Sequence, residues 1–181
     1  MEELLAVTRL EAGRDELTTE PVDLVALARH VIAAAEPIAS DQGLSLAVES
    51  DAARAFVRGD ALKLERMVEN LVTNAVKYSP AGAAVRATVR RSGDRVVVAV
   101  ADTGPGIPAE DAPHVFEKFY RARTPETYAV PGTGLGLSIV KLIAEAHGGE
   151  VTLRTALGAG STFTVSLPID GPRRSQASTA A

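Results

Sequence analysis

The feature that most constrains the fold is a helical pattern at residues 64–78 that has two different faces. Apolar side chains recur at three- and four-residue intervals, the spacing of a helix side buried against a core. Asn70, Asn74 and Lys77 stand at i, i+4 and i+7, so they share another flank of the same helix. Asparagine is about 0.7 kcal/mol less favourable than alanine inside a helix. Two solvated amides are the simplest explanation of this pattern. The alternative, which the rest of the sequence favours, is a core helix whose polar flank binds a ligand.

Two glycine-rich loops follow this helix in the chain. The first, Asp102-Thr103-Gly104-Pro105-Gly106, comes directly after an apolar run at residues 96–101, so a carboxylate stands where a buried strand ends. The second, Gly132-Thr133-Gly134-Leu135-Gly136-Leu137, leads into a helical pattern that is closed by Gly148-Gly149. Free N–H groups and the positive end of the helix dipole favour anions there, so the second loop is typical of a phosphate site. Either loop alone is more often a turn or a helix cap.

The order of these patterns resembles that of one protein family. An amide-bearing helix is followed by Asp-x-Gly-x-Gly after a strand, by Phe-Glu-Lys-Phe-Tyr-Arg at residues 116–121, and by Gly-x-Gly-x-Gly before a helix. This is similar to the N, G1, F and G2 boxes in the ATP-binding domain of sensor histidine kinases, from about Pro21 to Pro168. The resemblance implies the Bergerat fold of the GHKL superfamily, and the ligands ATP and Mg²⁺.

Turn and capping signals predict helices mixed with antiparallel hairpins. Asp23 can N-cap a helix that ends near Pro37, and Asp60 can cap the amide-bearing helix. Runs with strand composition, several of them paired across turn residues, lie at residues 44–48, 55–58, 85–91 with 95–101, and 151–155 with 162–167. We therefore expect an α+β fold: a two-layer α/β sandwich with helices on one face of a mixed, mainly antiparallel sheet.

Length and composition fit one domain with short extensions. With 181 residues, 46% of them hydrophobic, the chain can bury one sizeable core. A formal net charge of −4 gives no bulk attraction for nucleic acid, and the absence of cysteine excludes disulfides and thiol nucleophiles. No apolar run approaches the roughly 20 residues of a membrane-spanning helix. We expect a soluble, cytoplasmic fragment without direct membrane contact, and the sequence leaves open whether its parent is membrane-anchored.

The resemblance also divides the chain. It implies that residues 1–20 are the C-terminal end of a dimerisation and phosphoacceptor helical hairpin plus a linker, and that residues 21–169 are the catalytic ATP-binding domain. Residues 170–181, with Pro, Ser, Arg, Gln and terminal Ala, have the composition of a disordered tail. We expect a monomer in isolation and a dimer in the parent.

The base of ATP would be recognised near the first glycine loop. Adenine presents an exocyclic amine, and a buried carboxylate such as Asp102 is the acceptor that separates it from the carbonyl of guanine. Gly104 and Gly106 shape the loop around it. The resemblance implies that Thr162 helps to hold the same edge of the base through water. Tyr78 can stack on the ring, although a boundary tyrosine is the simpler reading.

The phosphates and the metal ion need oxygen ligands, cations and backbone amides. Mg²⁺ keeps several waters, so the side-chain oxygen of Asn74 with phosphate oxygens is a sufficient ligand set, and Asn70 would contact phosphate or a metal-bound water. Lys77 and Arg121 are the cations expected near the phosphates, with Lys118 a weaker candidate. The second loop supplies backbone amides from Gly132, Thr133, Gly134, Leu135, Gly136 and Leu137. We expect residues 116–132 to form a mobile lid.

One position favours phosphoryl transfer over hydrolysis. In hydrolytic relatives, the residue four before the metal-binding asparagine is a glutamate that activates water, whereas this chain has Asn70 there. An amide cannot act as a general base at neutral pH. Glu69 is one residue away, which on a helix is about 100° of rotation, so it should point away. We therefore assign catalytic roles to Asn70, Lys77 and Arg121 in transfer to an external acceptor, by positioning and charge stabilisation.

The expected acceptor is absent from this sequence. The family phosphorylates a histidine on a dimerising hairpin, but His30, His114 and His147 do not stand in such a motif and are expected to be surface or cap residues. The implied partners are the parent's hairpin and the receiver domain of a response regulator. Two alternatives stay open: a GHKL serine/threonine kinase acting on a sigma-factor regulator, and a noncatalytic nucleotide-sensing module.

Overall fold

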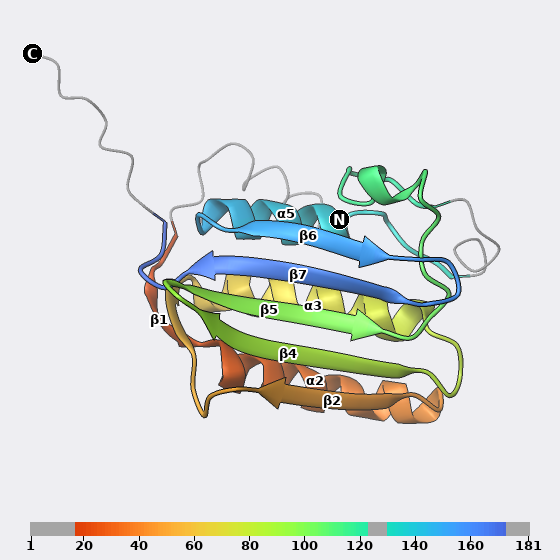
Figure 1. Cartoon of the computed structure of the whole chain (residues 1–181), viewed down its shortest axis with the longest axis horizontal. Coiled ribbons are helices and arrows are strands. Elements are labelled where there is room, and N and C mark those ends of the chain that lie inside the picture. Colours follow the sequence, from red (N-terminus) through yellow and green to blue (C-terminus); the bar gives the residue numbers. More distant parts are fainter. Residues whose placement is uncertain (1–16, 123–129, 173–181) are drawn as a thin grey trace, which may run out of the picture.

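A five-stranded sheet forms one layer of the structure, a computed structural model that describes residues 17–122 and 130–172. Figure 1 shows this sheet face on. The strand pair β2–β4 is parallel and the other neighbouring pairs are antiparallel, which confirms the predicted mixed, mainly antiparallel sheet. Across the sheet the order is β2 (Ser45–Ser50), β4 (Ala84–Ser92), β5 (Arg95–Asp102), β7 (Ser161–Pro168) and β6 (Glu150–Thr155).

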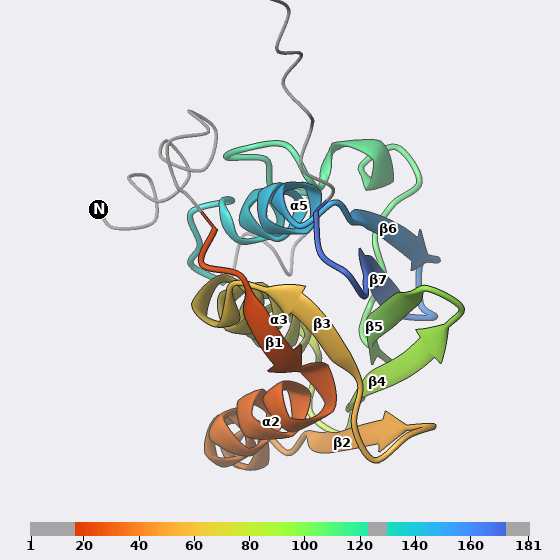
Figure 2. The same ribbon diagram turned by 90° about the vertical axis from the view of Figure 1, so that its left-hand side faces the viewer.

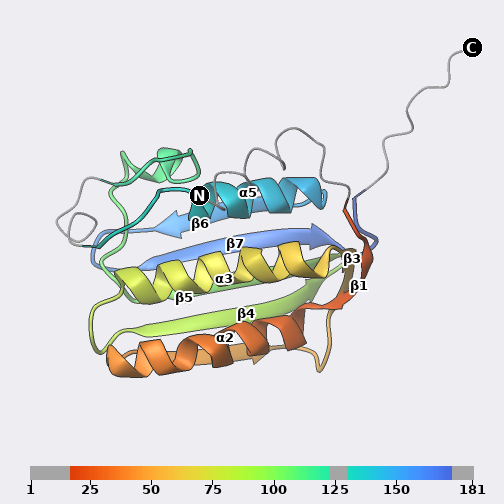
Figure 3. The same cartoon turned by 180° about the vertical axis from the view of Figure 1, so that it is seen from behind.

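Three helices form the second layer. They are α2 (Leu24–Asp41), α3 (Ala61–Tyr78) and α5 (Gly136–Ala146). Figures 2 and 3 show all three on the same face of the sheet. The strands alternate accordingly: in β7 the side chains of Phe163, Val165 and Leu167 are buried against the helices, while their neighbours are partly exposed. This arrangement confirms the predicted α+β sandwich.

Side-chain caps begin two of the helices where the sequence predicts them. The Asp23 carboxylate accepts a hydrogen bond from the Val25 N–H at 3.1 Å, and α2 starts at the next residue. Asp60 likewise caps α3, accepting from the Lys63 N–H at 3.1 Å. Both starts agree with the sequence analysis.

The end of α2 differs from the prediction. The sequence analysis ends this helix near Pro37, but the helix continues to Asp41 with Pro37 inside it. Proline removes one backbone hydrogen bond and normally disfavours a helix interior. Here Pro37 is on the exposed side, while Ala39 in the same turn is fully buried, so packing against the core retains the last turn.

A small second sheet lies at one end of the helices. Strand β1 (Glu20–Asp23) pairs antiparallel with β3 (Phe56–Gly59). Beyond β5, the short 3₁₀ helix η1 (Ala112–His114) comes just before the segment at residues 116–132 that the sequence analysis treats as a lid. Within the ranges that the structure describes, no helix combines the length and apolar character needed to cross a bilayer.

Three predictions fall partly outside the described residues. Residues 1–16 of the expected hairpin end, residues 123–129 of the expected lid and residues 173–181 of the expected tail are not covered. Residues 17–19 have no regular structure, and residue 20 already belongs to β1. The division of the chain into three parts therefore stays a prediction.

Candidate functional site

A cavity of about 410 Å³ opens where the C-terminal half of α3 meets the end of β5 and the second glycine loop. Asp102 and Asn74, which come from different layers of the fold, both line it. Most of the residues assigned to the site from sequence are brought together here: Asn70, Asn74, Lys77, Tyr78, Asp102, Gly106, Arg121, Gly132, Thr133, Gly134, Gly136 and Leu137. Their chemical roles stay predictions, but their meeting in one cavity is a property of the fold.

Asp102 forms a half-buried acceptor on one wall of the cavity. Its Oδ1 accepts hydrogen bonds from the Gly104 N–H at 2.9 Å and from the Ser161 N–H at 3.2 Å. Burial raises the pKa of the Asp102 carboxyl, and these two N–H groups oppose that shift. Within the described ranges both hydrogen bonds engage Oδ1, so Oδ2 is left to accept from a ligand.

Close backbone packing holds the end of β5 in place. At Gly160 a Cβ atom would lie 2.0 Å from the Asp102 carbonyl oxygen, and the residue has a φ of +81°. At Gly106 a Cβ atom would lie 2.0 Å from the Ala156 carbonyl oxygen. Neither position accommodates a side chain, so the first glycine loop is pressed against the β6–β7 turn.

The α3 amides lie directly against the start of α5. The Asn70 Nδ2 donates to the Arg66 carbonyl oxygen at 2.7 Å, which turns Oδ1 toward the glycine loop. A Cβ atom at Gly136 would lie 2.9 Å from Asn70 Oδ1 and 4.0 Å from Asn74 Nδ2. A larger residue at position 136 would therefore displace the amides.

Two cations meet the same loop at another side of the cavity. A Cβ atom at Gly132 would lie 2.7 Å from the Lys77 Nζ, so the ammonium group rests against the loop backbone. The Arg121 guanidinium donates to the Gly132 carbonyl oxygen at 3.2 Å and to the Val130 carbonyl oxygen. Lys77 Nζ also lies 5.3 Å from the centroid of the Tyr78 ring. These groups make this side of the cavity positive, which suits an anion.

The second glycine loop is anchored at its own apolar residue. Leu135 is 3% exposed, its N–H donates to the Thr133 hydroxyl at 3.3 Å, and its carbonyl accepts from the Ser138 hydroxyl at 2.8 Å. The Gly134 carbonyl accepts from the Phe119 N–H at 2.9 Å. The loop thus packs on residues of the Phe-Glu-Lys-Phe-Tyr-Arg segment, as their order in the sequence suggests.

Thr162 does not line the cavity. The sequence analysis expects it to help hold the base through water, and that role stays a prediction, whereas Ser161 and Phe163 are lining residues. Successive strand residues point to opposite faces, so an offset of one position moves a side chain to the other side of the sheet. Ser161 also bonds Asp102 through its N–H at 3.2 Å, which makes Ser161 the β7 residue beside the carboxylate.

Three further predicted residues lie just outside the cavity lining. Gly104 acts through its bond to Asp102, Leu135 is buried in the core, and Lys118 is exposed on the surface. Sequence reasoning missed Tyr120, which lines the cavity and whose hydroxyl donates to the Asp111 carboxylate. It also missed apolar walls at Ile107 and Val115. Tyr120 lies inside the quoted aromatic segment, so that motif could have indicated it.

The remaining titratable candidates do not face the cavity. Glu69 is exposed and is not a lining residue, as the helical rotation predicts. His30 and His114 are exposed and His147 is the C-cap of α5, as expected, although the His147 side chain is only 2% exposed. In the part of the chain that the structure describes, no group of three or more His, Cys, Asp or Glu residues could hold a metal ion.

The chain is similar to sensor histidine kinases in sequence and in structure. The family described as histidine kinase-, DNA gyrase B- and HSP90-like ATPase matches residues 59–171. The sensor-like histidine kinase SenX3 of Mycolicibacterium smegmatis is 36% identical over 172 residues, which cover 92% of this chain and 43% of SenX3. The sensor protein SphS of Synechococcus elongatus is 37% identical over 176 residues, which cover 93% of this chain and 42% of SphS.

A solved structure agrees with these sequence matches. Full-length ShkA in complex with AMPPNP superposes with a TM-score of 0.83 at 32% identity, covering 94% of this chain and 35% of ShkA. This chain therefore spans less than half the length of each of these three relatives.

Proposed function

The chain belongs to the histidine kinase-, DNA gyrase B- and HSP90-like ATPase family, as an ATP-binding catalytic domain of a two-component kinase, and on that premise we propose that it phosphorylates a histidine. The γ-phosphoryl group of Mg-ATP would pass to a histidine on a helical hairpin of the parent protein, for relay to an aspartate of a response regulator. The observation that carries this proposal is the single cavity that contains Asp102, Asn74, Lys77 and Arg121.

The adenine ring fits the Asp102 side of the cavity. Since Oδ1 is engaged by two backbone N–H groups, Oδ2 accepts the exocyclic amine of the base. Tyr78, Ile107 and Phe163 offer ring and aliphatic surface for the apolar faces of adenine. Full-length ShkA, to which the chain is similar, was solved in complex with AMPPNP, an ATP analogue, which supports a nucleotide as the ligand.

The phosphate chain fits the positive side. Lys77, Arg121 and the backbone amides of the loop at residues 132–137 give charge and hydrogen-bond donors to the phosphates. The donor set also fits Mg²⁺, because the Asn74 amide oxygen is a hard ligand and phosphate oxygens and waters can complete the ligand set. When bound, Mg²⁺ would neutralise charge on the phosphate oxygens. Asn70 would orient phosphate or a metal-bound water.

The residues on α3 favour transfer over hydrolysis. Asn70 stands where hydrolytic relatives carry a glutamate, and its Nδ2 already donates to the Arg66 carbonyl oxygen. Glu69 is exposed and faces away from the cavity. With no general base on the cavity lining of α3, water is not activated there. The positioned cations would then act on a group that the acceptor protein brings to the cavity.

The acceptor and the partners are supplied by the longer parent. We place residues 1–20 at the end of its dimerisation hairpin, residues 21–169 in the catalytic domain and residues 170–181 in a tail. The catalytic domain would work in the cytoplasm, as a monomer in isolation and within a dimer in the parent. His30 and His114 are exposed and do not line the cavity, so they are not assigned as acceptors.

Transfer to a separate hairpin tests the proposal. The chain is incubated with ATP labelled at the γ-phosphate, Mg²⁺ and a separately expressed histidine-bearing hairpin of the same parent. We expect label on the hairpin that is lost in acid and stable in base, and none on a hairpin whose acceptor histidine is alanine. Label that survives acid would indicate a serine/threonine kinase. Absence of label from a chain that binds ATP would favour a noncatalytic nucleotide sensor.

A further inference from the structure

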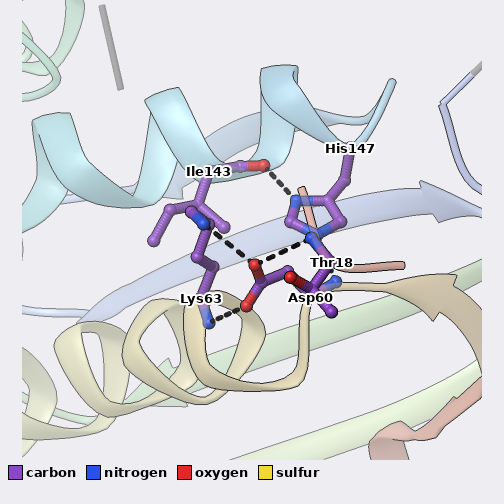
Figure 4. Close-up of polar contacts among 5 residues, drawn as sticks. All are labelled: Thr18, Asp60, Lys63, Ile143 and His147. Atoms are coloured by element: carbon purple, nitrogen blue, oxygen red, sulfur yellow. Dashed lines mark hydrogen bonds and ion pairs between the residues drawn. The ribbon is translucent and has the colours of Figure 1, made fainter. Parts of the chain in front are cut away.

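A buried polar cluster joins the C-terminal end of α5 to the N-terminal end of α3 (Figure 4). His147 caps α5, and its Nε2 accepts a hydrogen bond from the Asp60 N–H at 3.0 Å. Its Nδ1 lies 2.7 Å from the Ile143 carbonyl oxygen. The Asp60 carboxylate accepts from the Lys63 N–H at 3.1 Å, the Lys63 ammonium at 2.9 Å and the Thr18 N–H at 3.3 Å. Residues that are far apart in the chain thus meet around the buried Asp60 and His147.

The two contacts of the imidazole fix its protonation. A backbone N–H can only donate, so Nε2 carries a lone pair, and a carbonyl can only accept, so Nδ1 carries the proton. Burial lowers the pKa of His147; the bond to Ile143 and the charge of Asp60 oppose this shift, while the charge of Lys63 adds to it. His147 is therefore a neutral ring that holds the Asp60 N–H.

The backbone at Gly59 is shaped to admit this ring. A Cβ atom there would lie 2.7 Å from His147 Cδ2 and 2.7 Å from Leu64 Cδ1. The histidine is 2% exposed and Leu64 is fully buried, so neither can move aside without disturbing the core. The ring is thus confined between Gly59 and α5.

The same two helices meet again at the cavity. Gly136, the first residue of α5, lies against Asn70 Oδ1, as the 2.9 Å approach of an added Cβ atom shows. Along α3, Asp60 and Asn70 are about 15 Å apart, and along α5, Gly136 and His147 are about 16 Å apart, at 1.5 Å per residue. Figure 3 shows α3 and α5 side by side. The antiparallel pair is therefore matched at two points, one buried and one at the cavity.

We infer that His147 is a positioning residue for the nucleotide site: its bond to the Asp60 N–H sets the axial position of α5 against α3, and with it the position of the glycine loop relative to the α3 amides. This rests on the proposed function of the cavity as an ATP site. A helix is stiff along its axis, so a shift at His147 moves Gly136 by a similar amount. His147 itself is not among the residues that line the cavity.

The two sides of the cavity should respond differently to loss of this contact. The phosphate side is built from α3 and the loop that begins α5, so it depends on how the two helices are aligned. The base side is built around Asp102 on β5, which is bonded to Gly104 and Ser161 and not to α5. A shift of α5 would therefore weaken binding of a triphosphate more than binding of adenosine.

Two variants of His147 test this on the intact chain. In His147→Gln the side-chain oxygen can still accept from the Asp60 N–H, whereas in His147→Phe a ring of similar size has no acceptor. We expect His147→Phe to weaken ATP binding about tenfold, or about 1.4 kcal/mol, with adenosine affinity changed less than about twofold. His147→Gln should retain ATP affinity within about threefold. Calorimetry for ATP and NMR titration for adenosine measure both.

A stability control separates positioning from general weakening. Val89→Ala removes buried volume in the core at β4, outside the cavity lining, and should lower stability without changing the ratio of ATP to adenosine affinity. Equal weakening of both ligands by His147→Phe would overturn the positioning role and leave a purely structural one. Undiminished ATP affinity in that variant would overturn it too. A wild-type chain that binds neither ligand would contradict the proposed function instead.

Acidification gives a second test that does not need the phenylalanine variant to fold. When His147 gains a proton, Nε2 becomes a donor and can no longer accept from the Asp60 N–H. Around the ring, the charged groups that act on it in the described chain are Asp60 and Lys63. Falling pH should lower the ratio of ATP to adenosine affinity more in the wild type than in His147→Gln. Protonation of the ATP phosphates affects both proteins equally, so the difference between them reports on His147. Identical profiles would contradict the inference.

Discussion

The pair formed by α3 and α5 has polar groups at both ends, but the two ends use them differently. At the buried end, Asp60 and His147 are bonded to each other and to their neighbours, and both are less than 10% exposed. At the cavity end, Asn74 and Lys77 face open space that the cavity encloses. Ser79 Oγ, a buried hydroxyl without a partner in the described chain, also lies at this end, at the C-terminus of α3. Polar groups at the buried end bond one another and hold the helices, whereas Asn74 and Lys77 at the cavity end can contact a ligand.

The largest effect should come from the acceptor on β5. In Asp102→Asn the side-chain oxygen can still accept from the Gly104 and Ser161 N–H groups, but the amide nitrogen replaces Oδ2 and opposes the amine of adenine. We expect ATP affinity to fall about 100-fold, or about 2.7 kcal/mol, measured by calorimetry.

We expect Asp102→Asn to lower ATP affinity without lowering the stability of the fold. Burial raises the pKa of Asp102, so above the unfolded value of 3.8 its charge opposes folding, and removing the charge should raise the melting temperature. Asp94→Asn, in the exposed β4–β5 turn, is the matched control and should leave ATP affinity unchanged. Undiminished ATP binding by Asp102→Asn would remove the carboxylate from base recognition.

Two glycine substitutions compare the ends directly. An added Cβ atom would meet Asn70 Oδ1 at 2.9 Å in Gly136→Ala, and the His147 ring at 2.7 Å in Gly59→Ala. Gly136→Ala should lower ATP affinity about tenfold with little loss of stability, because alanine favours the helix by about 1 kcal/mol and offsets the crowding. Gly59→Ala should instead lower the free energy of unfolding by about 2 kcal/mol, because both neighbours are buried.

Urea unfolding and ATP titration of both variants give the answer. The comparison fails if Gly136→Ala destabilises the fold as much as Gly59→Ala does, since the cavity end would then be as tightly packed as the buried end.

A smaller effect should appear as a dependence of stability on pH. The pKa of His147 is lower in the folded chain than its ordinary value of 6.5. As the pH falls through 6.5, the unfolded chain therefore binds a proton at this histidine before the folded chain does. The contribution of this site is complete above pH 6.5 and is lost as the pH falls through 6.5 toward the folded pKa. Asp60 does not contribute to the pH dependence in this range. Burial raises the pKa of Asp60, but the hydrogen bonds and charge of Lys63 lower it by more, so the stability that Asp60 contributes is lost only as the pH falls to about 3.8 and below.

Urea unfolding of the wild type and of His147→Gln between about pH 7.5 and 5 measures this effect. The variant should lose less stability over that range, and His30 and His114 cancel because both chains retain them. Parallel curves for the two chains would mean that His147 is not held neutral by burial.

The cavity end and the buried end of the α3–α5 pair also differ in how much of each can be predicted from the sequence. The polar flank of Asn70, Asn74 and Lys77 follows from helical periodicity, and the caps at Asp23 and Asp60 follow from local residue preferences. Local patterns of this kind also predict the hairpins and hence the mixed sheet. The spacing of the residues and the order of the motifs therefore predict many of the side chains that line the cavity.

What the sequence could not supply was long-range packing. Asp60 and His147 are 87 residues apart in the chain, and no local pattern pairs them. Pro37 stays inside α2 because tertiary packing outweighs its helix-breaking tendency. Thr162 was assigned by resemblance alone, whereas the register with β5 places Ser161 opposite Asp102, and a one-residue offset in a strand reverses the facing of a side chain.

The smallest effect should come from an ion pair that belongs to neither end. Arg86 Nη1 lies 3.1 Å from Glu49 Oε1 across the parallel strands β2 and β4, and both side chains are about half exposed. Exposed pairs contribute about 0–1 kcal/mol because water screens them and both side chains lose rotamer freedom. Arg86→Gln should change the free energy of unfolding by less than about 0.5 kcal/mol in urea, and leave ATP affinity unaltered. This variant gives the loss of stability expected for an exposed polar contact. If Arg86→Gln lost as much stability as Gly59→Ala, burial would not explain why the contacts around His147 matter more than exposed ones.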